Sequence, residues 1–218
     1  MWTKQNLQNW IFEMNKKQLS ILLSKISSFE KQDVKLEQYP TDPNIAAEVL
    51  WDAYLKGDIE DKLIADLGCG HGILGLGALV LGAKKVIFVD IDKNALDVAK
   101  KNKIALEKEL NKKFETMFLH ENVRSFKKKV NVILQNPPFG VKKSHMDKLF
   151  LLKAMEMAPV IYTFHKLSTE KFIKKITADY NYKIKQKYVF NFPLKKSFWF
   201  HLKSVHYIDV CCWNLVKV

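Results

Sequence analysis

The chain has 218 residues, of which 48% are hydrophobic and 12% aromatic, so it can bury a core and general disorder is excluded. No apolar run reaches the ~18 residues of a membrane span, and the N-terminus lacks the apolar stretch of a signal peptide. We therefore expect one soluble, intracellular domain that has no contact with a membrane and is cytoplasmic, or nuclear in a eukaryote.

The net charge of +13 is unevenly spread, because residues 141–218 hold 15 lysines against five acidic residues. A basic excess of this size predicts a polyanionic partner, although a lysine-rich surface that is merely solvated is the alternative. Arg124 is the single arginine. Lysines act as point charges, which suits contacts with phosphates more than the reading of bases.

The N-terminal part predicts two helices. Apolar residues recur with helical spacing over Asn15–Phe29, which favours an amphipathic helix. We assign residues 1–40 to an N-terminal extension with this helix, and residues 41–218 to the main domain. Thr41 or Asp42 can cap a second helix, which has Pro43 in its first turn and runs to about residue 56.

Strands and helices alternate through the rest of the chain. Strands are predicted over Leu63–Leu67, Lys85–Val89, Phe114–Leu119, Val130–Gln135 and Val160–Phe164. Helices are predicted over Ile73–Leu81, Lys93–Leu110, Met146–Met157 and Ser168–Tyr180, the last with a capping signal at 168–171. Two late strands, Tyr182–Phe190 and Val205–Leu215, suggest a closing hairpin. The pattern predicts a doubly wound α/β fold, with a mostly parallel seven-stranded sheet, a terminal antiparallel strand and N-terminal helices.

Acidic residues end the first two strands, where such a sheet binds its ligands. Asp66 precedes Gly68 and Gly70, whose lack of a side chain lets backbone approach a ligand. Asp90, 24 residues further on, is placed to accept ribose hydroxyls. The glycine spacing differs from that of NAD(P) sites, and the carboxylate of Asp66 would repel a pyrophosphate. We therefore favour S-adenosylmethionine, with its cationic amino-acid end. Asn122 can meet the adenine of that cofactor or satisfy its own turn.

The fourth strand ends at Asn136-Pro137-Pro138-Phe139. Two prolines cannot continue a ladder, because neither has a backbone N–H. The amide oxygen of Asn136 and the carbonyl of Pro137 are acceptors for an NH₂ group, and Phe139 offers a face on which a ring can stack. These four residues predict methyl transfer to an amino nitrogen, and a base would have to be flipped or single-stranded to reach them.

The histidines and cysteines near these motifs favour simpler roles. Cys69 and His71 lie in the glycine loop, where packing is the favoured interpretation. Adjacent Cys211 and Cys212 point to opposite faces of a strand, so we expect buried thiols and neither a disulfide nor a metal site. His165 either shapes the target pocket or caps the following helix.

Three segments carry a family resemblance: residues 36–41, residues 136–140, and His165-Lys166 followed by Ser168-Thr169. They are similar to the methyltransferase-like small-subunit ribosomal RNA adenine-N6 methylases of eukaryotes and their archaeal relatives. These belong to the Rossmann-like S-adenosylmethionine-dependent methyltransferases. The resemblance covers about residues 17–215. It implies that Gln38 and Thr41 close over the cofactor, that Gly68 and Asp90 bind it, and that residues 136–139 hold the adenine of ribosomal RNA.

The resemblance also implies a partner, because eukaryotic members use a small zinc-containing activator protein that pairs along a sheet edge. In the family's strand order that edge is Phe114–Leu119. A candidate RNA face combines lysines with aromatic residues: Lys183, Lys185, Lys187, Lys195, Lys196 and Lys203, with Phe192, Phe198 and Trp199. The alternatives are methylation of a release-factor glutamine, RNA guanine-N2 methylation, and an RNA-binding module without catalysis.

Overall fold

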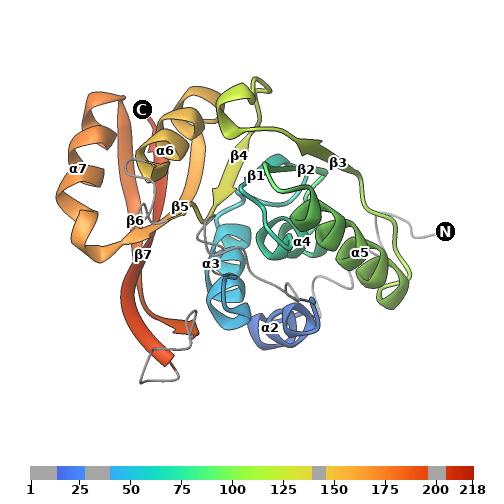
Figure 1. Cartoon of the computed structure of the whole chain (residues 1–218). Coiled ribbons are helices and arrows are strands. Elements are labelled where there is room, and N and C mark those ends of the chain that lie inside the picture. The colour runs from blue at the N-terminus through green and yellow to red at the C-terminus, as the bar shows by residue number, and fades with distance from the viewer. Residues whose placement is uncertain (1–13, 28–39, 139–145, 196–204) are drawn as a thin grey trace.

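A seven-stranded sheet forms the centre of the protein in a computed structural model that describes residues 14–27, 40–138, 146–195 and 205–218 (Figure 1). The strands lie in the order β3-β2-β1-β4-β5-β7-β6. They are β1 (Leu63–Leu67), β2 (Lys85–Asp90), β3 (Thr116–His120), β4 (Val132–Gln135), β5 (Val160–Lys166), β6 (Tyr182–Lys195) and β7 (Val205–Lys217). The first five run parallel, and β7 is antiparallel to both of its neighbours. The predicted doubly wound sheet is confirmed.

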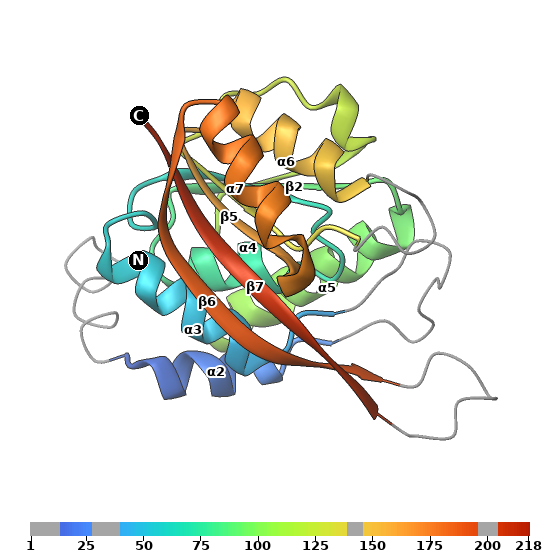
Figure 2. The same ribbon diagram turned by 90° about the vertical axis from the view of Figure 1, so that its left-hand side faces the viewer.

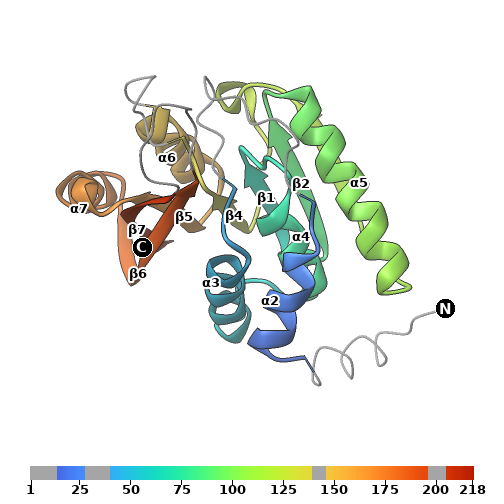
Figure 3. The same ribbon diagram turned by 60° about the horizontal axis from the view of Figure 1, so that its bottom comes forward.

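Helices cover both faces of this sheet. They are α2 (Lys16–Ser24), α3 (Pro43–Leu55), α4 (Ile73–Val80), α5 (Lys93–Glu109), α6 (Met146–Met157) and α7 (Glu170–Asp179). Short 3-10 turns stand at η2 (Val123–Ser125) and η3 (Leu167–Thr169). Figure 3 shows α3 and α4 on one side of the strands, with α6 and α7 on the other. Within the described ranges, no helix is long and apolar enough to span a membrane.

Two hydrophobic cores follow from the alternation of side chains along the strands. Ile64 packs into the core under α2, α3 and α4, whereas its neighbour Ala65 packs into the core under α6 and α7. Cys212 lies in the first of these cores and Cys211 in the second. Both are fully buried and carry free thiols. The prediction of buried cysteines on opposite faces is confirmed.

The N-terminal helix α2 is built into the first core through Leu19 and Leu23, which are fully buried. Asn15 and Gln18 form a reciprocal capping box at its start. The helix ends at Ser24, earlier than predicted, because the backbone N–H of the next residue bonds back three residues and tightens the last turn. The domain boundary at residue 40 stays a prediction.

The helix α7 differs from its prediction at its start. It begins at Glu170, after the η3 turn, and Thr169 at the N-cap makes no capping bond with its side chain. The hydroxyl of Thr169 instead donates to the carbonyl of Lys166 at 2.8 Å. The predicted capping signal at 168–171 is therefore wrong, because the hydroxyl is used by the preceding turn.

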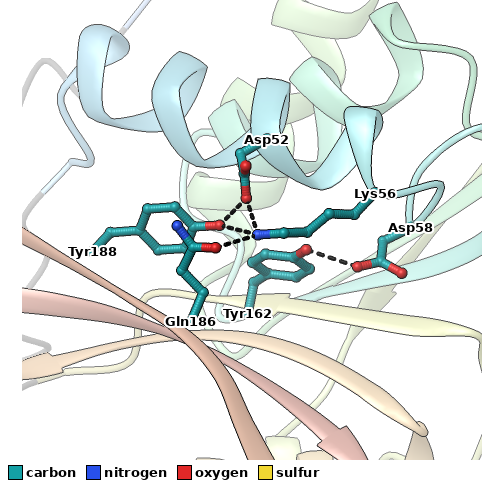
Figure 4. A network of polar contacts seen from close by, with 6 residues as sticks. All are labelled: Asp52, Lys56, Asp58, Tyr162, Gln186 and Tyr188. Atoms are coloured by element: carbon teal, nitrogen blue, oxygen red, sulfur yellow. Dashed lines mark hydrogen bonds and ion pairs between the residues drawn. The ribbon is translucent and has the colours of Figure 1, made fainter.

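The β6–β7 hairpin is longer than predicted and crosses the molecule beside β5 (Figure 2). A polar network holds it to α3 and the turn after α3 (Figure 4). Lys56 donates to Tyr188 Oη and to Gln186 Oε1, each at 2.8 Å, and pairs with Asp52, which also accepts from Tyr188. Beside it, Tyr162 donates to Asp58 at 2.7 Å. The network therefore ties the N-terminal third of the chain to its C-terminal hairpin.

Candidate active site

The predicted site residues gather at the carboxyl ends of β1, β2 and β4. Strand order reverses between β1 and β4, so crossovers leave in opposite directions there and open a place for a ligand. In the ladders, Leu67 lies opposite Val89 on one side and Gln135 on the other. Three adjacent strands therefore bring Asp66, Asp90 and Asn136 together at the carboxyl ends of the parallel strands.

The glycine loop is shaped by its hydrogen bonds to the two acids. Gly70 N–H donates to Asp90 Oδ2 at 2.8 Å, and Gly75 N–H in α4 donates to Asp66 Oδ2 at 2.9 Å. Gly68 has φ +66°, and a Cβ there would lie 2.9 Å from the ring of Phe150. The position therefore requires glycine both for its backbone conformation and for its close packing.

The two acids carry perturbed carboxyl groups. Burial raises the pKa of Asp66 to about 7, an effect that the Gly75 N–H opposes and the charge of Asp90 reinforces. Burial also raises the pKa of Asp90, against the backbone donors of Asp92 and Gly70. Two buried carboxyl groups at one edge disfavour a further anion and favour a cationic ligand, which would hold both in their charged form. The acids thus fit the amino-acid end and the ribose of S-adenosylmethionine.

Asn136 presents an acceptor that is ready for a donor. Its Nδ2 donates to Thr41 Oγ1 at 3.0 Å, whereas its Oδ1 is buried and has no hydrogen-bond partner within the described residues. An unpaired buried acceptor is costly, and functional sites are where such atoms persist. Pro137 is buried and Pro138 half-buried, so the chain leaves the sheet at this point as predicted.

The other predicted residues differ in outcome. Asn122 caps η2 by accepting from Arg124 N–H at 3.0 Å. Its oxygen therefore satisfies its own turn, which was one of the two predicted roles. Gln38 and Phe139 lie outside the described residues. His71 is buried in the loop, and burial lowers its pKa to about 4, which agrees with the predicted packing role.

His165 belongs to a buried polar chain and does not cap α7. Gln135 Nε2 donates to Thr163 Oγ1 at 2.9 Å, and Thr163 Oγ1 lies 2.9 Å from His165 Nε2. The three side chains form a continuous polar chain, in which the threonine hydroxyl links the amide of Gln135 to the imidazole of His165. Nδ1 lies 4.0 Å from Asp147 Oδ2 in the first turn of α6. Burial lowers the pKa of His165 to about 3, so the ring is neutral.

Two residues near the loops were missed by sequence reasoning. Asn102 Nδ2 donates to the carbonyls of His71 and Ser27, each at 2.9 Å, and so joins α5 to the glycine loop. A buried asparagine at an apolar position of α5 is the signal that could have revealed it. Ile91 follows Asp90 and is 52% exposed, which is an apolar surface beside the predicted ribose site.

The candidate RNA face is described only in part. Lys183 and Lys185 are exposed on β6. Lys187 pairs with Glu170 at 3.2 Å and lies 5.5 Å from the centroid of the Trp213 ring, so its charge is partly satisfied by the protein itself. The structure does not describe the aromatic side chains or the remaining lysines proposed for this face. The face therefore stays a prediction.

An anionic group at the ends of β1 and β2 beside an amide acceptor at the end of β4 suits methyl transfer from a sulfonium to an amine. Such a site on a doubly wound sheet fits the class of S-adenosylmethionine-dependent methyltransferases. Across the described ranges, no three His, Cys, Asp or Glu side chains gather as a metal site would need.

Comparisons with known proteins agree. Residues 42–158 match the methyltransferase small domain family. The rRNA N(6)-adenosine-methyltransferase METTL5 of Danio rerio is 37% identical over 88% of this chain and 93% of its own. An uncharacterised protein of Methanocaldococcus jannaschii is 33% identical, over 94% and 95%. The crystal structure of a candidate RNA methyltransferase from Pyrococcus horikoshii superimposes with a TM-score of 0.83 at 40% identity, over 94% and 98% of the two chains.

The chain belongs to the methyltransferase small domain family and, within it, to the family of the rRNA N(6)-adenosine-methyltransferase METTL5. It is a Rossmann-like methyltransferase whose cofactor is S-adenosylmethionine. The family resemblance, the fold and the cofactor predicted from the sequence are thereby confirmed.

Proposed function

We propose that this protein methylates the N6 amino group of an adenine in ribosomal RNA, and that its substrate is small-subunit RNA. The observation that carries the proposal is the buried Oδ1 of Asn136 at the end of β4, directly before Pro137 and Pro138, which has no hydrogen-bond partner among the residues that the structure describes. Relatives named for N6-adenosine methylation of rRNA span nearly the whole chain, and the net charge of +13 suits an RNA partner.

Each predicted residue has a role in this reaction. Asp66 and Gly68 hold the amino-acid end of the cofactor with the backbone of the loop, and Asp90 accepts from its ribose. Gly70 fixes the orientation of Asp90 through the 2.8 Å bond already described. Gln38 remains a proposed contact of the cofactor, as does Asn122, although the Asn122 oxygen already accepts from Arg124 N–H. Phe139 remains a proposed stacking surface for the target base.

Bound S-adenosylmethionine supplies an activated methyl group on a sulfonium, so neither a metal nor a covalent enzyme intermediate is required. Asn136 Oδ1 and the carbonyl of Pro137 accept the two hydrogens of the adenine NH₂. These acceptors pull the nitrogen lone pair out of conjugation with the ring and stabilise the positive charge that develops there. With the cofactor bound, the nitrogen lone pair would take the methyl group as the S–CH₃ bond breaks, the sulfonium would leave as a neutral thioether, and the methylated nitrogen would release one proton to solvent.

The test is replacement of Asn136 with Ala. We expect loss of methyl transfer to RNA with unchanged binding of S-adenosylmethionine, because the acceptor and not the cofactor site is removed. Binding by isothermal titration calorimetry and transfer of tritiated methyl groups measure the two separately. Retained transfer in Asn136→Ala would contradict the assignment of the site.

We also propose that a small zinc-containing protein pairs with β3, as the family resemblance implies. β3 is an edge strand of the sheet. Val86 N–H donates to Glu115 O and Glu121 N–H donates to Asp90 O, so the odd-numbered residues face β2 and the N–H of Thr116 points outward. An edge with free outward groups is a place for a partner strand.

Thr116→Pro tests this partner, because it removes one outward donor without removing a bond to β2. We expect weaker co-purification with the partner and an unchanged melting temperature of the isolated chain. Undiminished co-purification would place the partner elsewhere.

A further inference from the structure

Thr41 contacts the catalytic amide directly, although 95 residues separate the two in sequence. Asn136 Nδ2 donates to Thr41 Oγ1 at 3.0 Å. The threonine side chain is buried, with 5% of the residue exposed. The family resemblance implies only that Thr41 closes over the cofactor, whereas this bond links it to the group that would hold the target amine.

The backbone of Thr41 is held by a rigid neighbour. Asp42 caps α3 by accepting from the N–H groups of Asn44 and Ile45, at 2.8 and 3.3 Å, and Pro43 occupies the first turn. The helix α3 is anchored in the core by fully buried Leu50. The hydroxyl of Thr41 therefore meets Asn136 from a fixed support, as a positioning group must.

The donors and acceptor of an amide explain how this contact can support the reaction. The side chain of Asn136 has one acceptor and two donors, and a target NH₂ brings only donors. In the productive orientation Oδ1 faces the amine, so the amide NH₂ must find an acceptor in the protein. Thr41 Oγ1 is that acceptor. If the amide were rotated by half a turn, its NH₂ would face the NH₂ of the substrate, and two donors would oppose each other.

We propose that Thr41 is a positioning residue for methyl transfer: its hydroxyl oxygen pairs the NH₂ of Asn136 and so keeps Oδ1 directed at the target nitrogen. The proposal rests on the proposed function of Asn136. It separates Thr41 from the cofactor contacts, because its loss should lower turnover and leave cofactor affinity alone.

The test compares Thr41→Val, which keeps the shape and removes the hydroxyl, with Thr41→Ser, which keeps the hydroxyl. A buried, unpaired NH₂ in the productive orientation predicts a kcat about 10- to 100-fold lower in Thr41→Val. The dissociation constant of S-adenosylmethionine should stay within about twofold, and Thr41→Ser should recover kcat to within about threefold. Thr177→Val is the matched control, since this buried threonine lies in α7, far from Asn136 in the sheet order, and its hydroxyl donates within its own helix to Ile173 O.

Two outcomes overturn the proposal. One is an unchanged kcat at saturating cofactor with weakened cofactor binding, which would make Thr41 a cofactor contact. The other is Thr41→Ser as impaired as Thr41→Val, which would show that the methyl group and not the hydroxyl matters.

A readout independent of turnover is the side-chain amide signal of Asn136 in ¹H–¹⁵N spectra, assigned by its absence in Asn136→Asp. We expect a slowly exchanging proton in the native chain that is lost in Thr41→Val and kept in Thr41→Ser. An unchanged signal in Thr41→Val would refute the contact. If the native chain methylates no RNA, the proposed function fails, and this spectrum still decides the role of Thr41.

Discussion

At the scale of single residues, Asp66 is the acid whose chemistry departs furthest from that of a free side chain. It is 1% exposed, accepts one backbone N–H from Gly75, and has a pKa raised to about 7 by burial. Between about pH 4 and pH 7 the folded protein without ligand therefore holds a proton that the unfolded chain has lost, so ionisation of Asp66 destabilises the fold as pH rises through this range. A bound cationic ligand would stabilise the ionised carboxylate and so remove this loss of stability.

Cofactor affinity should accordingly depend on pH near neutrality. A cationic amino-acid end prefers the ionised carboxylate, so we expect S-adenosylmethionine to bind about tenfold more weakly at pH 6 than at pH 8. Titration calorimetry across this range measures the effect, and Asp66→Asn should bind more weakly with little pH dependence. A flat profile in the native chain would mean that Asp66 does not meet the cation.

The sequence allowed us to predict which residues form the site, but not which of them contact one another. Asp66 and Asp90 lie in the last residues of apolar strands and Asn136 directly follows one, so their place at the carboxyl ends of the strands follows from the pattern. The bond between Asn136 and Thr41 could not be predicted, because spacing along the chain says nothing about a pair brought together by packing of α3. The buried position of Asn102 also depends on how α5 lies on the glycine loop.

At the scale of elements, α4 packs on β2 without room for a side chain at Gly75. A Cβ on Gly75 would lie 2.4 Å from the ring of Phe88 and 2.9 Å from Val86, whereas a Cβ on Gly77 would lie 2.4 Å from one leucine methyl, Leu50 Cδ1, and at least 3.4 Å from any other atom outside its helix. The Phe88 ring is itself stacked on Phe118, with centroids 4.8 Å apart. The glycine that faces the sheet is therefore the more constrained of the two.

Gly75→Ala should destabilise the protein by about 1–3 kcal/mol, because the ring and the strand cannot move aside. Gly77→Ala should cost at least ~1 kcal/mol less, because a leucine methyl can turn away and alanine favours the helix. Urea denaturation of the two variants measures the difference. Equal losses would show that the interface of α4 with β2 is looser than its geometry indicates.

Two strands begin later than predicted, because the N–H of the residue expected to open each one bonds to an acceptor outside the sheet. Phe114 was predicted to open the third strand, but its N–H donates to the carboxylate of Glu107 in α5 at 2.7 Å. Val130 was predicted to open the fourth, but its N–H donates to Met157 O. Both residues are buried and apolar, and hydrophobic pattern alone does not distinguish them from strand residues.

At the scale of the whole molecule, the C-terminal hairpin is held against the N-terminal half by Lys56 and its partners (Figure 4). Lys56 also lies 5.3 Å from the centroid of the Tyr188 ring. Burial raises the pKa of Tyr188, and the Asp52 carboxylate adds to that effect. The phenol therefore stays protonated and keeps donating to Asp52.

Lys56→Met should destabilise the protein by about 1–2 kcal/mol, because Gln186 and Tyr188 lose a charged donor that bridges α3 and β6. Lys100→Met is the matched control. Its ion pair with Asp97 lies within α5, and its ring contact is with Phe118, so it should cost less than ~0.5 kcal/mol. Hydrogen exchange should rise along β6 in the first variant only. Equal protection of β6 in both would show that packing alone holds the hairpin.

The fold, the site and the family together predict one reaction on one class of RNA. The direct measurement is to incubate the native chain with labelled S-adenosylmethionine and, separately, with small-subunit RNA, large-subunit RNA and release factor, and to identify the methylated species by mass spectrometry after digestion. N6-methyladenosine from small-subunit RNA is the predicted result. Methylated guanine, methylated glutamine, or N6-methyladenosine confined to large-subunit RNA would contradict it.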